Sequence, residues 1–180
     1  MARFQQSASA DGFPVARRSC GACSLCCKLL GIAALDKPQG QWCVHVADGV
    51  GCAIHDRSPD ECRRFFCSWI MTPALDDDWR PDRCGLVLWT NQSNRVVIDV
   101  DAETPEAWRA EPYYSQFKAW SDRSEPGSLE ILVRVQGRMI VIFPEADVDL
   151  GLHDKTEGIA SGYRMEHGRS VPFAHYVPAA

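Results

Sequence analysis

The pattern of hydrophobic and polar positions changes near residue 85. Beyond it, short apolar runs alternate with turn-forming residues, which is typical of strands joined in hairpins. The expected strands are 86–89, 95–100, 129–135, 139–143, 159–165 and 171–176. Turns stand between the members of these pairs, at 91–94, 136–138 and 167–168. The second half therefore predicts a small antiparallel sheet.

One interrupted helix is expected within the same half. Segment 104–106 has the residues of a helix start, with Thr104 as the N-cap. Pro112 breaks or restarts this helix, which continues over 113–120. Residues 85–180 are therefore expected to form an α+β part with antiparallel hairpins and one or two helices.

The first half has little periodicity. Residues 1–18 are rich in Ser, Ala and Gln and predict a disordered N-terminal tail. Ser58 and Glu61 have the spacing of a capping box, with Pro59 at the first helical position. This helix start places Cys62 in the first turn.

Cysteines dominate the rest of the first half. The chain has nine: Cys20, Cys23, Cys26, Cys27, Cys43, Cys52, Cys62, Cys67 and Cys84. A small hairpin around Asp48 and Gly49 would present Cys43 and Cys52. We therefore expect a cysteine-cluster metal-binding module over residues 19–84, joined to the α+β part.

The spacing within the first cluster suggests a shared face. Cys20, Cys23 and Cys27 would lie on one side of a helix. Cys26 and Cys27 would point about 100° apart, so equal binding to one metal is not expected. Cys67 reaches the same centre as the earlier thiols only if the helix that begins after Ser58 ends early.

Composition narrows the class of protein. The 180 residues are 46% hydrophobic and carry a net charge of −5, which argues against a nucleic-acid binder. No apolar run approaches the length of a membrane span, and no secretory signal is apparent. A cytoplasmic location is expected, where thiols stay reduced. Clustered cysteines then favour metal over disulfides or unligated buried thiols.

Two kinds of metal centre suit the C-x2-C-x2-C spacing. A [4Fe-4S] cluster takes one thiolate on each iron, and zinc is satisfied by four thiolates or by three and a histidine. Eight cysteines would serve two such sites and leave Cys84 over, or one site could use four of them. His45 and His55 follow cysteines closely and suit either mixed ligation or an ordinary polar role.

Motifs for other chemistry are missing from the sequence. It contains no glycine-rich phosphate loop, no H-E-x-x-H and no G-x-S-x-G. A cysteine–histidine nucleophile is conceivable, but so many clustered thiols make any single one a poor candidate. Whether the protein is an enzyme stays open.

The cysteine motifs can be compared with a known family. Read in order, they are Cys20-x2-Cys23-x2-Cys26-Cys27-Lys28, Cys43, Gly51-Cys52-Ala53-Ile54-His55 and Arg57-Ser58-Pro59-x2-Cys62-Arg63-x3-Cys67. This order resembles the YkgJ-type cysteine-cluster family, described as zinc- or iron-chelating. The resemblance departs at His55, where the family usually has an aromatic residue, and at Ser58, which separates Arg57 from Pro59.

The resemblance implies metal binding through eight thiols. They are those of Cys20, Cys23, Cys26, Cys27, Cys43, Cys52, Cys62 and Cys67. Flagellin lysine N-methylases carry a related cluster that looks like an iron–sulfur centre needed for stability. Their methylation is not carried over, because no S-adenosylmethionine site is recognisable in this chain.

Three functions follow as expectations. The first is a protein that holds an iron–sulfur cluster, of the [4Fe-4S] type, with a structural or redox role. The second is a zinc-binding structural or interaction module with a protein partner. The third is an accessory factor or enzyme for peptide modification, which needs a pocket between the two halves bordered by Trp69, Trp79 or Trp89.

Overall fold

The computed structural model describes residues 15, 18–91, 95–122, 129–153 and 157–178. Its helices are α1 (Cys26–Leu29), α2 (Asp60–Arg64), α3 (Ser68–Met71), α4 (Pro81–Cys84) and α5 (Tyr113–Ser121). Short 3-10 helices are η1 (Ala33–Leu35), η2 (His55–Arg57), η3 (Asp77–Trp79) and η4 (Ala107–Arg109). The strands are β1 (Val46–Ala47), β2 (Gly51–Cys52), β3 (Leu86–Thr90), β4 (Arg95–Val100), β5 (Glu130–Val135), β6 (Arg138–Ile142), β7 (Asp147–Leu152), β8 (Glu157–Glu166) and β9 (Arg169–Pro178).

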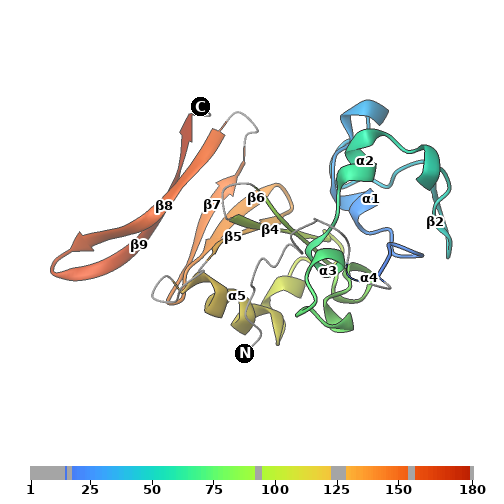
Figure 1. The fold of residues 1–180 in the computed structure, drawn as a ribbon. Helices are drawn as coiled ribbons and strands as arrows, with labels where there is room; N and C mark the ends of the chain where they lie inside the picture. Colours follow the sequence, from blue (N-terminus) through green and yellow to red (C-terminus); the bar gives the residue numbers. More distant parts are fainter. Residues whose placement is uncertain (1–14, 16–17, 92–94, 123–128, 154–156, 179–180) are drawn as a thin grey trace.

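A five-stranded sheet with the order β3-β4-β5-β6-β7 forms the centre of the molecule. Figure 1 shows it between the β8–β9 hairpin and the segment that carries α1, α2 and β2. The α+β class is confirmed. The sheet is mixed, however, because β4 and β5 run parallel, with Asp99 opposite Arg134. The connection through η4 and α5 makes that direction possible, and the hydrophobic pattern of a strand carries no information about its direction.

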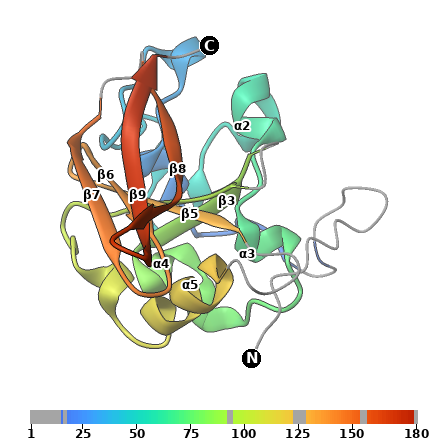
Figure 2. The same ribbon diagram turned by 90° about the vertical axis from the view of Figure 1, so that its left-hand side faces the viewer.

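The two faces of the sheet are covered by different elements. One face packs against α5, whose Phe117 side chain is fully buried with those of Ile98 and Ile131. The other face packs against the β8–β9 hairpin, which lies in front of the sheet in Figure 2. There Phe143 meets the edge of Tyr163 at 5.4 Å between ring centroids. Successive apolar side chains along a strand therefore pack alternately against α5 on one face and against the β8–β9 hairpin on the other.

The predicted hairpins are present. β3 pairs with β4, β5 with β6, and β8 with β9 around the turn at His167 and Gly168. The prediction missed β7, whose sequence DVDLGL alternates apolar residues with aspartates and a glycine. That composition is unfavourable for a strand, and pairing with β6 overrides it.

Both predicted N-caps are wrong. Ser58 caps no helix: α2 has no side-chain cap hydrogen bond, and the Ser58 hydroxyl donates to the carbonyl of His55 at 2.8 Å. Pro59 takes the N-cap position of α2, and Cys62 still falls in the first turn. Thr104 begins a turn before η4, and α5 starts only after Pro112, which confirms the restart there. Local hydrogen bonding to a nearby carbonyl competes with capping for such residues.

The core runs without a break from the cysteine module into the sheet. Leu25, Leu29 and Trp69 pack in the same cluster as the buried residues of β3 to β6. At the end of the predicted tail, the Arg18 guanidinium donates to the carbonyls of Trp69, Thr72 and Leu75. The prediction for residues 1–14 and 16–17 lies outside the described residues. None of the described helices is long and apolar enough to cross a membrane.

Candidate metal centre

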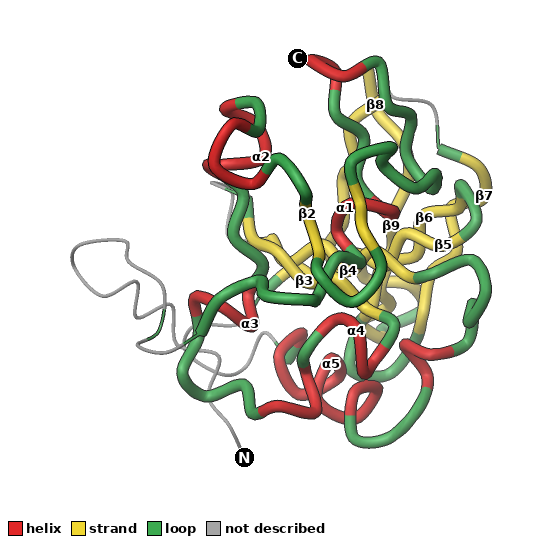
Figure 3. The backbone as a smooth tube through the Cα atoms, turned by 90° about the vertical axis from the view of Figure 1, so that its right-hand side faces the viewer, coloured by secondary structure: helices red, strands yellow, loops and turns green. Residues whose placement is uncertain are grey.

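All nine cysteines have free thiols, so no disulfide holds the module together. The expectation that Cys20, Cys23 and Cys27 share a helical face is wrong, because α1 begins only at Cys26. Cys20 and Cys23 lie in the preceding turn, where the Cys23 N–H donates to the Cys20 carbonyl at 2.8 Å. Figure 3 views the module from its outer side, with α1, α2 and β2 around these loops.

Seven cysteines line one cavity of about 170 Å³, here called the outer cavity. They are Cys20, Cys23, Cys26, Cys27, Cys43, Cys52 and Cys62. His45 and His55 line it as well, and Phe65 closes part of it. Seven of the eight thiols expected to bind metal are therefore gathered around a common space.

Two backbone contacts bring the loops of this cavity together. The Cys43 N–H donates to the Cys27 carbonyl at 3.0 Å, which fastens the hairpin segment to α1. Gly51 has a φ of +92°, and a Cβ there would lie 2.4 Å from the Gly21 carbonyl oxygen. Only glycine permits this approach, which places Cys52 on β2 beside the loop of Cys20.

A second, smaller cavity shares three of these cysteines, Cys20, Cys23 and Cys26, with the outer cavity. This inner cavity of about 20 Å³ is lined by Cys20, Cys23, Cys26, Phe65, Cys67, Trp69, Ile70 and Pro81. Because α2 ends at Arg64, Cys67 leaves that helix and becomes the N-cap of α3. Cys84 lines neither of these cavities; its buried thiol donates to the Leu86 carbonyl at 3.5 Å.

A hydrogen bond between the side chains of Cys26 and Cys27 makes one thiol of this pair easier to ionise than the other. A hydrogen bond from Cys26 lowers the pKa of Cys27 below the ordinary thiol value, and the positive charges of Lys37 and His55 act in the same direction. The same bond raises the pKa of Cys26. Since the thiolate is the form that binds metal, Cys27 is the first of the pair ready to bind.

Sequence reasoning missed Lys37, which it placed in a turn. The side chain is buried, and its ammonium group donates to the carbonyls of Lys28 and Leu30. Burial lowers the pKa of Lys37 below its ordinary value, and the nearby thiolates of Cys43 and Cys27 offset only part of this shift. A cation in this place balances negative charge on thiolates. Its sequence signal was only a lysine ten residues after Cys27 and six before Cys43.

The donor set suits a thiophilic metal, but the side chains are not drawn together around a single point. Among the described residues, no group of three or more His, Cys, Asp or Glu side chains is arranged to hold a metal ion. Metal binding would therefore have to draw the thiols inward. One further feature fits: Trp69 lines the inner cavity, and its buried indole N–H has no hydrogen-bond partner among the described residues. An N–H donor of this kind stabilises thiolate sulfur.

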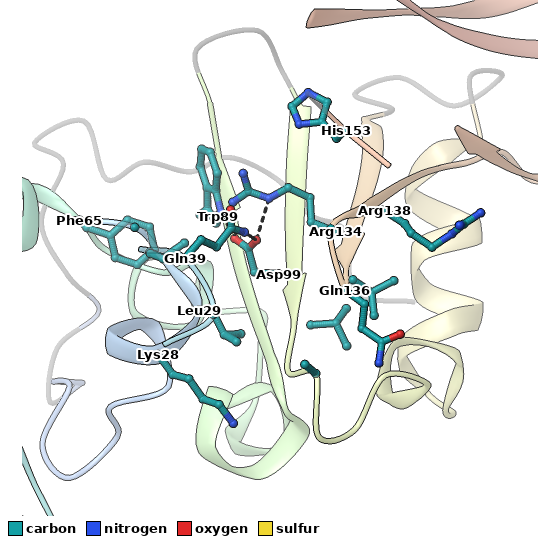
Figure 4. Close-up of a pocket in the computed structure, with 17 residues that line it drawn as sticks. Lys28, Leu29, Gln39, Phe65, Trp89, Asp99, Arg134, Gln136, Arg138 and His153 are labelled. Carbon is teal, nitrogen blue, oxygen red and sulfur yellow. Dashed lines mark hydrogen bonds and ion pairs between the residues drawn. The ribbon is translucent and has the colours of Figure 1, made fainter. Parts of the chain in front are cut away.

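A much larger cleft of about 900 Å³ lies between the module and the sheet. Figure 4 shows Arg134 and Asp99 facing one another within it, with Trp89 and Gln39 beside them. Asp99 accepts hydrogen bonds from Arg134 Nε and Nη2 at 2.7 and 2.8 Å, and from the Trp89 indole at 2.8 Å. The cleft adjoins the carboxyl ends of the parallel strands β4 and β5, where Val100 and Val135 line it.

Lys28 joins the cleft to the cysteine loops. It directly follows Cys27, and its ammonium pairs with Asp101 at 2.8 Å and with Glu103 at 2.7 Å. Burial opposes the charged form, but these two hydrogen bonds outweigh burial and raise the pKa of Lys28. If metal binding shifted α1, it would therefore also move Lys28 at the wall of the cleft.

Comparison of the chain with family models, with curated proteins and with solved structures finds no match. The resemblance to the YkgJ-type family rests on the cysteine motifs alone.

Proposed function

We propose that this protein holds an iron–sulfur cluster, of the [4Fe-4S] type, in its cysteine module, with a structural or redox role. The observation that carries the proposal is the outer cavity, where seven free thiols surround one space. A cubane cluster needs four thiolates on four different irons, and this cavity offers more than enough. The buried Lys37 ammonium offsets part of their negative charge.

The test is anaerobic purification followed by iron and acid-labile sulfide analysis. We expect a brown protein with broad visible absorbance that bleaches on reduction. Cys62→Ala should lose most of this absorbance, because Cys62 lines the outer cavity. Cys84→Ala is the matched control, since its buried thiol lines neither cavity, and it should keep the colour. A colourless protein without iron or sulfide would overturn the proposal.

Zinc is the alternative metal. Four thiolates, or three and one of the histidines His45 and His55, would form a structural zinc site that supports an interaction surface for a protein partner. Zinc without iron or sulfide in the same measurement would favour this alternative. In either case we propose a cytoplasmic location, where thiols stay reduced, and binding to neither nucleic acid nor membrane.

The cleft favours a second candidate function, that of an accessory factor or enzyme for peptide modification. That function needs a pocket between the halves bordered by one of three tryptophans, and Trp89 lines the cleft. The cleft volume falls within the range of ligand sites. The Asp99–Arg134 pair and Gln39 supply fixed donors and acceptors to an extended backbone.

A peptide array probed with metal-loaded protein tests this candidate. We expect capture of a subset of peptides by the wild type and loss of that capture in Trp89→Ala. Trp42→Ala is the control, because Trp42 is half-exposed and lies outside the cleft lining. Equal loss in both variants, or no capture at all, would exclude the cleft as a peptide site.

A further inference from the structure

The eight thiols expected to bind metal fall into two groups of four. Four line only the outer cavity, and one lines only the inner cavity, while three lie between the cavities and line both. The outer group is Cys27, Cys43, Cys52 and Cys62. The inner group, formed by the shared three and the remaining thiol, is Cys20, Cys23, Cys26 and Cys67.

We propose that the module holds two separate metal centres: the iron–sulfur cluster on the outer group and a single tetrahedral ion, of the zinc class, on the inner group. This inference rests on the proposed function, because the outer group carries the cluster proposed there. Each group offers four thiols, which is the number of thiolates that either centre requires.

Cavity size separates the two kinds of centre. The inner cavity of about 20 Å³ has room for one ion and little more, since about 10–15 Å³ of such space holds one water molecule. The outer cavity of about 170 Å³ is several times larger and has room for a core of iron and sulfide. Zinc lies about 2.3 Å from each sulfur, so it needs no space beyond its four ligands.

The two centres would be neighbours, because Cys20, Cys23 and Cys26 line both cavities.

Adjacent cysteines at the end of the first run explain how one loop serves both centres. Cys26 and Cys27 are consecutive, and only Cys26 reaches the inner cavity. Two-cluster ferredoxins divide a cysteine run in the same way, where the fourth cysteine of the run binds the other cluster. Here Cys67, far along the chain, would complete the set begun by Cys20, Cys23 and Cys26.

Metal analysis of anaerobically purified variants tests the division. The wild type should contain about four iron atoms, about four sulfides and about one zinc per chain. Cys67→Ala should lose the zinc and keep the iron and sulfide. Cys62→Ala should lose the iron and sulfide and keep the zinc, and Cys84→Ala should lose neither. Loss of both metals in both folded variants would overturn the division.

A measurement on the intact chain keeps the test decisive if a variant does not fold. Protein produced in zinc-poor, cobalt-supplemented medium should show the bands of tetrahedral cobalt–thiolate beside the cluster absorbance. Iron and sulfide without zinc, and without cobalt bands, would overturn the inner site while leaving the proposed function intact. Zinc or cobalt without iron and sulfide would overturn the proposed function and leave the inner site.

Discussion

The cysteine module and the sheet part are built by different means. In the module, the longest helix, α2, has five residues and the strands β1 and β2 have two each. In the sheet part, β3 to β7 have five or six residues each, and most interior positions of β4, β5 and β6 are buried and apolar. Long strands and α5 therefore supply most of the shared core, to which the module adds residues such as Leu29 and Trp69 from short elements. The loops that carry the cysteines add little to that core.

This difference indicates which region would depend on a bound metal for its folding stability. Burial of large apolar side chains stabilises the sheet part without any ligand. In the module, Val44 and Val50 are largely exposed, and Trp42 is half-exposed, so the loop around them buries little. If the protein holds the proposed metal, metal–thiolate bonds would stabilise this loop region, because binding free energy becomes folding free energy there.

Metal removal is expected to have the largest effect, and to have it in the module alone. Stripping metal from the anaerobically purified protein should speed amide hydrogen exchange over residues 20–62 by about a thousandfold or more, since structural zinc alone contributes about 10–16 kcal/mol in small domains. Amides of β4, β5 and β6 should change little. Exchange measured by mass spectrometry on both forms decides the question. Equal acceleration in both regions would contradict the comparison.

Phe117→Ala should give the next largest effect, in the sheet part. Phe117 on α5 is fully buried and meets the rings of Trp79 and Trp120 at 5.9 and 5.8 Å. Its removal leaves a cavity and should lower the free energy of unfolding by about 3–5 kcal/mol in a urea titration. Phe66→Ala is the matched control in the module, where the ring is 40% exposed, and it should cost less than about 1 kcal/mol. Equal losses would show that the two regions do not differ in packing.

The sequence predicted the strands well because each is a short apolar run between turn residues. β4 and β6 lie within one residue of their expected bounds, as the valines and isoleucines that define them are also those that are buried. The parallel pairing of β4 with β5 could not be predicted, since it depends on the path of the chain through α5. β7 was missed because its aspartates and glycine make the alternation of apolar and polar residues hard to recognise as a strand.

The candidate site was predicted in its members but not in its arrangement. Seven of the eight expected thiols line the outer cavity, because their identity is visible in the sequence. The sequence made the position of Cys67 depend on an early end of its helix, and α2 does end at Arg64. Cys67 nevertheless lines only the inner cavity, because it becomes the N-cap of α3. The burial of Lys37 could not be predicted from its place between the cysteines either, as it depends on the backbone bridge between Ile32 and Lys37.

A smaller effect is expected at the junction of the two regions. Gly85 has a φ of +72°, and a Cβ there would lie 2.8 Å from Thr104 Oγ1. Gly85→Ala should cost about 2 kcal/mol of unfolding free energy, from the left-handed backbone and the contact together. Gly151→Ala has a similar φ of +78° but open space, so it should cost about 1 kcal/mol.

The double variant Gly85→Ala/Thr104→Ala separates these two causes in the same urea titration. Removing the Thr104 hydroxyl should return the cost of Gly85→Ala to about that of Gly151→Ala. An unchanged cost in the double variant would show that the contact with Thr104 contributes nothing, and that the junction is no tighter than the sheet edge.

The smallest effect is expected at that sheet edge, where charge pairs are exposed. Burial opposes ionisation of Asp149, but hydrogen bonds from Arg138 at 2.8 Å and from the Gly151 N–H at 2.8 Å lower its pKa. Because the folded-state pKa lies below the unfolded value, the stabilisation is present above about pH 4 and is lost as the pH falls through the folded pKa. Asp149→Asn should therefore cost a few tenths of a kcal/mol near pH 7, and nothing near pH 2, in urea titrations at both values. A cost that persists at pH 2 would assign the effect to the side-chain amide and not to the charge.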